Sequence, residues 1–341
     1  MKWLRNAVLL LFVFLFIWLF ITLFGNESLC LAALCATAIL MFTNIPLQLP
    51  RLTCYLLFPF LMWLTVIVPY LLQWHYSILL NCAIVCGVTL LVLFLLGPSL
   101  SYQSYVPFLF LLALNLNTKI TKPVLLSFAA ILSGFILAIT YSITHNKRKK
   151  PPKTLAILRS TFQSHRLFIL KLTIGILISY VIGYEIHYVK TSWIILTVIS
   201  LTQVDFNDTK QKLIDRIKAT IIGILIYNFF ILLVADQFPQ LIPIILIVVT
   251  YIYTFVKNYF VKMIFITFNA LNAAVASTHV SDLSMMISRL DFIIIGSCIT
   301  LLIGVVARFI HGTRDSMTQK EVESIRESDN VENIESDENE L

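Results

Sequence analysis

The stretch RLDFIIIGSCITLLIG, residues 289–304, places an arginine and an aspartate at the start of a long apolar run. A second stretch, RIKATIIG at residues 216–223, also begins with an arginine and carries a glycine seven positions later. Seven residues make about two helical turns, so each arginine shares a helix face with its glycine. Since a spanning helix needs about 20 mostly apolar residues, such runs predict a membrane protein.

Long apolar runs recur along the whole chain. Of its 341 residues 59% are hydrophobic and 13% are charged, which excludes an ordinary water-soluble globule. We predict an all-α, polytopic membrane protein with about 12 transmembrane helices, the first of them uncleaved. The expected spans lie near 7–24, 28–43, 52–72, 76–96, 104–117, 123–143, 167–184, 191–204, 217–235, 240–256, 260–277 and 290–310.

The basic residues predict which side each loop occupies. With the N-terminus inside, 21 of the 25 Lys and Arg residues fall in or beside cytoplasmic segments. The positive-inside rule therefore predicts a multi-pass protein of the plasma (cytoplasmic) membrane with both termini in the cytoplasm.

The apolar pattern divides into two halves at the basic stretch HNKRKKPPK, residues 145–153. LALNLNT in the first half resembles FNALNAA in the second, and six spans per half predict two six-helix repeats of the same orientation. We expect a degenerate first repeat at 1–144, a basic cytoplasmic linker at 145–166 and a second repeat at 167–310. The polar, acidic tail at 311–341 is expected to be disordered and cytoplasmic.

The two arginines are the first candidates for function, because ionisable residues in membrane helices are costly and commonly functional. Gly223 and Gly296 predict close helix packing on the arginine-bearing faces, so Arg216 and Arg289 are expected to point into the bundle. Thr220 shares the face of Arg216. The topology predicts the two arginines at opposite ends of an anion path, and the alternative is pairing with a neighbouring aspartate or with lipid phosphate.

Other polar residues are candidates for the same path. The asparagines in the matching spans predict either a polar lining or helix–helix clamps, and Arg51 opens a span as Arg216 does. Asp291 and Asp205 are the candidates for proton coupling. The asparagines are Asn115, Asn117, Asn269 and Asn272.

No motif for an enzyme, a bound cofactor or a metal site is found, and the six cysteines all lie in apolar segments. We therefore expect no enzymatic activity, no cofactor, no metal and no nucleic-acid partner.

The second half resembles a known family. KTSWIILTVISL (190–201), the polar turn DFNDTKQKLIDR (205–216), IKATIIG, NYFVKMIFITFNAL (258–271) and RLDFIIIGSCITLLIG resemble the fusaric acid resistance protein-like membrane domain. This family includes aromatic acid exporters and is similar to plant aluminium-activated malate transporters. Trp193 and Thr197 match its Trp and "LTV" pattern, and Arg216, Thr220 and Gly223 match its Arg, Gly-Thr and Gly, with Ala219 in place of the first Gly.

The resemblance implies a transporter that exports organic anions, often aromatic carboxylates, between two six-helix units. It also implies the lipid bilayer and an adaptor protein or a homo-oligomer as partners, although the large cytoplasmic domain typical of such exporters is not recognised here. The alternative function is a non-transporting membrane scaffold in cell-envelope assembly.

Overall fold

A computed structural model describes residues 2–42, 51–74, 77–97, 100, 103–116, 120–144, 165–186, 190–203, 206–231, 249, 252, 256, 258–277 and 283–309. Regular structure in these ranges is helical throughout, as the sequence predicts. The predicted linker is described only from residue 165, and the predicted acidic tail and most of the span expected at 240–256 lie outside these ranges.

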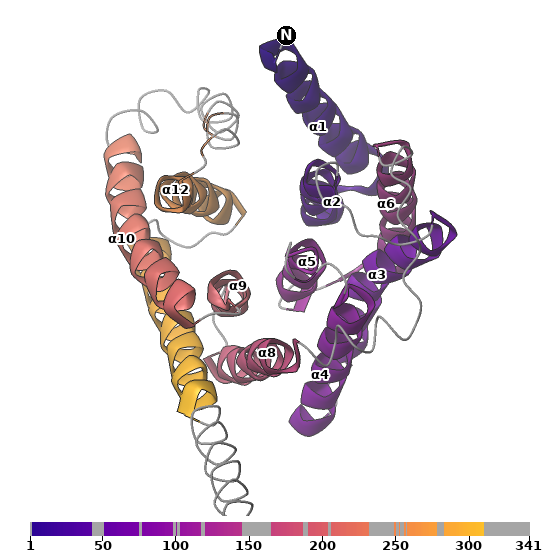
Figure 1. Cartoon of the computed structure of the whole chain (residues 1–341). Helices are drawn as coiled ribbons and strands as arrows, with labels where there is room; N and C mark the ends of the chain where they lie inside the picture. The colour runs from indigo at the N-terminus through magenta and orange to yellow at the C-terminus, as the bar shows by residue number, and fades with distance from the viewer. Residues whose placement is uncertain are drawn as a thin grey trace, which may run out of the picture.

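Figure 1 shows the arrangement of the described helices. The first half contains α1 (Lys2–Phe24), the short 3-10 helix η1 (Asn26–Ser28), α2 (Leu29–Phe42), α3 (Arg51–Leu72), α4 (Ile78–Leu95), α5 (Val106–Leu116) and α6 (Pro123–Thr144). The second half contains α8 (Arg166–Ile186), α9 (Ser192–Leu201), α10 (Phe206–Phe230), α12 (Tyr259–Ser277) and the helix Leu283–Phe309, which is yellow and unlabelled in Figure 1.

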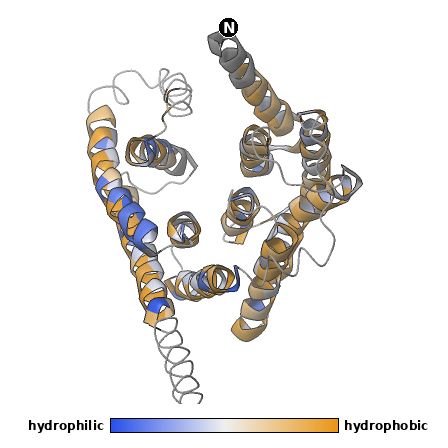
Figure 2. Cartoon of the chain, viewed as in Figure 1, coloured by the Kyte–Doolittle hydropathy of each residue, from blue (hydrophilic) through white to orange (hydrophobic). Residues whose placement is uncertain are grey.

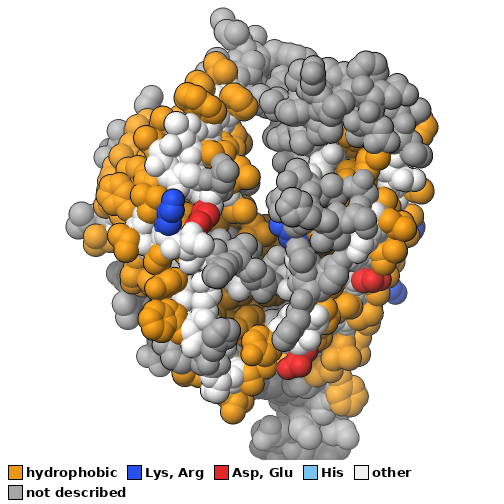
Figure 3. Space-filling view, turned by 180° about the vertical axis from the view of Figure 1, so that it is seen from behind, with side chains coloured by type: hydrophobic (Ala, Val, Ile, Leu, Met, Phe, Trp, Pro, Cys, Tyr) orange, Lys and Arg blue, Asp and Glu red, His pale blue; other side chains and the backbone are white. Residues whose placement is uncertain are grey.

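Several of these helices match the dimensions of a bilayer. Among the described residues, five helices are long and apolar enough to cross a membrane: Thr53–Leu72, Ile78–Leu95, Pro123–Thr144, Arg166–Ile186 and Leu283–Phe309. Hydrophobic side chains cover most of the helices in Figure 2, and they dominate the described surface in Figure 3. The chain is therefore a membrane protein with several apolar helices.

Two helix starts differ from the sequence prediction. The polar segment at 205–216 is predicted as a turn, but α10 already begins at Phe206, and its first turns form the hydrophilic section seen in Figure 2. Asp208 in the first turn favours this start, since a carboxylate stabilises the positive end of a helix. The 283–309 helix likewise begins six residues before Arg289. Both arginines therefore lie inside helices and not at their starts.

The first half is built around a close contact between α3 and α6. A Cβ atom at Gly134 of α6 would lie 2.3 Å from the Cα of Pro59 and 2.7 Å from the carbonyl carbon of Phe58. Only a glycine permits backbones to approach this closely. α3 also contains Pro69, which cannot donate the usual hydrogen bond to the carbonyl of Thr65.

The short helix α9 joins the two parts of the core. Its side chains Ile195 and Ile199 pack in the cluster formed with α1–α6 and α8, whereas Trp193, Ile194 and Val198 pack with α10, α12 and the 283–309 helix. Figure 1 shows α9 between these two groups, next to α5. With 10 residues α9 is about 15 Å long. It is therefore only about half as long as the hydrocarbon core is thick.

Candidate functional site

Two arginines are buried beside α9. Arg216 of α10 is 5% exposed and Arg289 of the 283–309 helix is 3% exposed. Nη1 of Arg216 contacts the sulfur of Met263 on α12. The guanidinium carbon of Arg289 lies 4.5 Å from the ring centroid of Trp193, so the cation stacks on the indole face. Such a contact contributes about 2 kcal/mol when water is excluded.

The two guanidinium groups lie near the same short helix, α9. Arg289 lies within the electrostatic range of Arg216, and the two positive charges repel. The prediction that they lie at opposite ends of the protein is therefore wrong. Arg289 contacts Trp193 near the start of α9, whereas Tyr259, which lies beside Arg216, is near Ser200 close to the end of α9. Because α9 has 10 residues and is about 15 Å long, the two guanidinium groups are not separated by the thickness of a membrane.

Neither charge is neutralised by the protein in the described part of the chain. No carboxylate forms an ion pair with either guanidinium there, and the Nε atoms of Arg216 and Arg289 are buried without a hydrogen-bond partner. Arginine remains charged in proteins, and a buried, unpaired charge costs several kcal/mol. The two guanidinium groups therefore form an electropositive region among the packed helices.

Close helix contacts hold the arginine-bearing helices in place. A Cβ at Gly296 would lie 2.8 Å from the Cβ of Thr197 and 3.0 Å from the carbonyl oxygen of Ile194, both on α9. A Cβ at Gly223 would lie 2.8 Å from the Cβ of Thr267 and 3.0 Å from the carbonyl oxygen of Ile264, both on α12. Each glycine is two turns from its arginine, so these contacts fix the face that carries the guanidinium.

The threonines of the predicted path donate within their own helices. Thr197 Oγ1 donates to the Trp193 carbonyl oxygen at 2.7 Å, and Thr220 Oγ1 donates to the Arg216 carbonyl oxygen at 2.8 Å. Both side chains are buried. Because both hydroxyl protons are donated to backbone carbonyls, neither is available as a donor to an anion.

The predicted asparagines do not form one group. Asn115 Nδ2 on α5 donates to the carbonyl oxygen of Thr65 at 3.0 Å, which is the acceptor that Pro69 leaves without its helical partner. Asn272 Nδ2 donates to the Phe268 carbonyl oxygen of its own helix at 2.9 Å. Asn115 thus clamps α5 to α3. Asn269 is half-buried on α12, and Asn117 lies outside the described residues.

The predicted acidic residues do not face the arginines in the described structure. Asp291 is exposed, whereas Arg289, two positions earlier, is buried against α9. Side chains at i and i+2 point to different faces of a helix. Asp205 and the side chain of Arg51 lie outside the described part of the chain.

Three further groups near the site escaped the sequence prediction. Tyr259 of α12 lies beside Arg216, and Lys212 lies 5.5 Å from the centroid of the Tyr259 ring. Partial burial lowers the pKa of Lys212, while Asp208 opposes this shift. Met263 contacts Arg216 directly. A sequence pattern offers no signal for these contacts, because they arise from the packing of α10 on α12.

A polar junction links the two halves near the other end of α9. Lys171 of α8 is 9% exposed, and its Nζ donates to the Gln203 carbonyl oxygen at 3.2 Å. Gln103 Nε2 from the first half donates to Gln203 Oε1 at 3.2 Å. Beside them lies a cavity of about 10 Å³, the size that holds one water. The buried Lys171 therefore takes part in a polar contact between segments that are distant in the sequence.

These observations agree with the comparison against protein families. Residues 174–303 match the family model described as fusaric acid resistance protein-like. This segment of the chain is similar to that family. It contains α9 with Trp193, α10 with Arg216 and the start of the 283–309 helix with Arg289, so the whole arginine site lies within the matched segment. Searches against curated proteins and solved structures found no match.

Proposed function

We propose that this protein exports organic anions, including aromatic carboxylates, across the plasma membrane. Arg216 and Arg289 attract the anion and bind it transiently. The path runs between two six-helix units of the same orientation, which together form twelve spans with both termini in the cytoplasm. The likeness to malate transporters, which rests on the sequence motifs, points to the same class of substrate.

The observation that carries the proposal is the arginine pair without a counter-ion among the described residues. A structural role is normally accompanied by a carboxylate partner, because a buried charge is stable only when it is paired and hydrogen-bonded. An organic carboxylate supplies this partner, since its two oxygens accept charge-assisted hydrogen bonds from guanidinium groups.

The site is also suited to release of the anion. Trp193 holds Arg289 through a cation–π contact, which keeps the guanidinium in place when no anion is bound. An anion bound between the two positive charges relieves their repulsion, so the electropositive region attracts anions. The anion binds with modest affinity because few hydrogen-bond donors surround it. Attraction combined with modest affinity is what passage through a membrane path requires.

Transport in reconstituted vesicles tests the proposal. The full chain is placed in liposomes loaded with radiolabelled benzoate, and efflux is compared for the wild type, Arg216→Gln and Arg289→Gln. Lys218→Gln is the matched control, since Lys218 is an exposed cation on the same helix as Arg216. We expect both arginine variants to lose at least about tenfold in flux, the effect of removing one charge-assisted hydrogen bond, and the control to retain it.

Flux that is unchanged in both arginine variants, at equal protein content, contradicts the proposal and favours the scaffold hypothesis. A loss of the same size in Lys218→Gln points to the general surface charge and not to the buried pair. A panel containing benzoate, malate and chloride shows whether the path prefers organic anions over small inorganic ones.

A further inference from the structure

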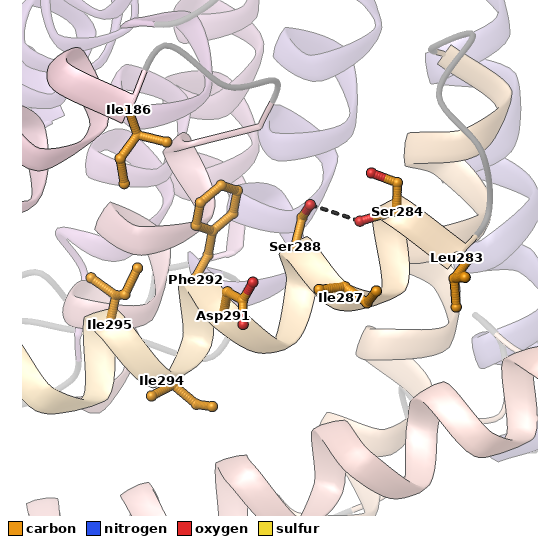
Figure 4. A pocket seen from close by; sticks show the side chains of 9 residues that line it. All are labelled: Ile186, Leu283, Ser284, Ile287, Ser288, Asp291, Phe292, Ile294 and Ile295. Atoms are coloured by element: carbon orange, nitrogen blue, oxygen red, sulfur yellow. Dashed lines mark hydrogen bonds between the residues drawn. The ribbon is translucent and has the colours of Figure 1, made fainter.

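A second feature of the 283–309 helix lies on the face opposite to the arginine site. An open hollow of about 630 Å³ lies between the end of α8 and the start of this helix (Figure 4). The volume is within the range of small-molecule sites in proteins. Among the described residues its lining is mostly apolar and includes the carboxylate of Asp291: Ile186, Leu283, Ser284, Ile287, Ser288, Asp291, Phe292, Ile294 and Ile295.

Asp291 is the unusual member of this lining. It is exposed, and Ile287 and Ile294 on the same side of the helix are 53% and 41% exposed. In a membrane helix such isoleucines face acyl chains. The 283–309 helix has 27 residues and is about 40 Å long, so it exceeds the hydrocarbon core by about 10 Å. Asp291 is about 12 Å from the helix start, which is more than this excess, so an upright helix that spans the core places Asp291 inside it.

A carboxylate at this depth requires a cation, because ionised side chains in the membrane are costly unless they are paired. The described part of the chain does not provide one. Arg289 points to the other side of the helix and stacks on Trp193. The hydroxyl of Ser288 donates to the carbonyl oxygen of Ser284 at 2.7 Å, as Figure 4 shows, and so its proton is not directed to the carboxylate.

We infer that this hollow binds a phospholipid with a primary ammonium headgroup, such as phosphatidylethanolamine. The ammonium pairs with Asp291, and an acyl chain lies over the exposed isoleucines. A primary ammonium has three N–H donors, as a lysine has, and forms a charge-assisted hydrogen bond with a carboxylate. The quaternary ammonium of phosphatidylcholine has no N–H donor, so it forms no such bond. The site therefore prefers phosphatidylethanolamine to phosphatidylcholine, although both lipids are zwitterionic and have the same net charge.

The occupant is a lipid because of where the hollow opens. Its rim is formed by apolar side chains of a membrane helix, among them Leu283, which is 65% exposed. Lipid is the solvent of this face, and it contains both the ammonium and the hydrocarbon that the lining complements. The inference is independent of the proposed transport activity, since Arg289 and the hollow lie on different faces of the helix.

Lipid retention tests the inference. The full chain is reconstituted in nanodiscs with equal amounts of phosphatidylethanolamine and phosphatidylcholine, extracted in mild detergent, and the lipids that remain bound are counted by native mass spectrometry. We expect the wild type to retain phosphatidylethanolamine over phosphatidylcholine by roughly tenfold, the equivalent of one charge-assisted hydrogen bond. Asp291→Asn should remove this preference, and Asp291→Glu should keep most of it.

The matched control is Asp208→Asn, which removes an exposed carboxylate from the polar start of α10. Its lipid preference should equal that of the wild type. Equal retention of the two lipids by the wild type, or an unchanged preference in Asp291→Asn, overturns the inference. A dimer that is present in the wild type and absent in Asp291→Asn also overturns the inference, because a second copy of the chain then occupies the hollow. Asp291→Glu restores the carboxylate and separates a loss of binding from a loss of folding.

Discussion

Replacing Gly296 by alanine probes the contact on which the arginine site depends. The added methyl carbon would lie 2.8 Å from the Cβ of Thr197 and 3.0 Å from the carbonyl oxygen of Ile194. Carbon atoms pack best at about 3.5–4.0 Å, so the 283–309 helix must move away from α9 by about 1 Å. This movement also carries Arg289 away from Trp193, since the arginine is on the same helix face.

The energetic effect follows from two opposing terms. Overpacking costs about 1–3 kcal/mol, while the change from glycine to alanine in a helix contributes about 0.5–1 kcal/mol of stability. We therefore expect Gly296→Ala to destabilise the protein by about 0.5–2 kcal/mol. Gly134→Ala should be worse, because its methyl carbon would meet the Pro59 backbone at 2.3 Å. Gly87→Ala is the control: nothing lies within 4 Å of its added carbon, and it should be neutral or stabilising.

Thermal unfolding in detergent measures the relative stability of the three glycine variants. Cys35 and Cys54 are fully buried, so a thiol-reactive dye reports the temperature at which the helices separate. The unfolding midpoint should decrease from Gly87→Ala through Gly296→Ala to Gly134→Ala. The reasoning is refuted if Gly134→Ala unfolds at or above the midpoint of Gly87→Ala. A Gly296→Ala variant with lower stability but full anion flux would show that the packing of the helix does not position the guanidinium.

Three further outcomes are expected. Trp193→Leu removes the ring beneath the guanidinium and should reduce benzoate efflux about tenfold, as the loss of 1–2 kcal/mol implies; unchanged efflux would exclude a positioning role. Asn115→Leu leaves the Thr65 carbonyl without a partner and should lower the stability by about 1–3 kcal/mol, measured by a thermal shift assay. Adding Pro69→Ala to this variant should restore much of the lost stability, because the alanine supplies the missing N–H. Cys298 is exposed on the 283–309 helix and should react in membranes with an apolar maleimide but not with a charged one; equal labelling by both would place it in water.

Several properties of the site can be derived from the sequence. The spacing of each arginine to a glycine seven residues later predicts that both share a packed face, and both arginines are indeed buried beside close helix contacts. The membrane class follows from the apolar runs, because hydrophobicity alone determines whether a helix is stable in lipid. These features depend only on residues that are neighbours on one helix.

The relative position of the arginines depends on tertiary structure. The sequence assigns them to opposite sides of a membrane, since a span is expected to cross it fully. In the fold α9 is short, and the helices around it bring the guanidinium groups of Arg216 and Arg289 within electrostatic range of each other. A helix start is also poorly defined by hydropathy, because a polar segment such as the beginning of α10 can continue the helix outside the apolar region.

The sequence by itself determined the helical membrane class, the family resemblance of the second half and the packed faces that carry Arg216 and Arg289, because these rest on local composition and spacing. Only the tertiary structure decided that the arginines lie together, that Trp193 supports one of them, and that Asn115 satisfies a carbonyl freed by Pro69. The physical reason is that contacts between helices depend on their length, tilt and packing. None of these is encoded in the order of residues along a single helix.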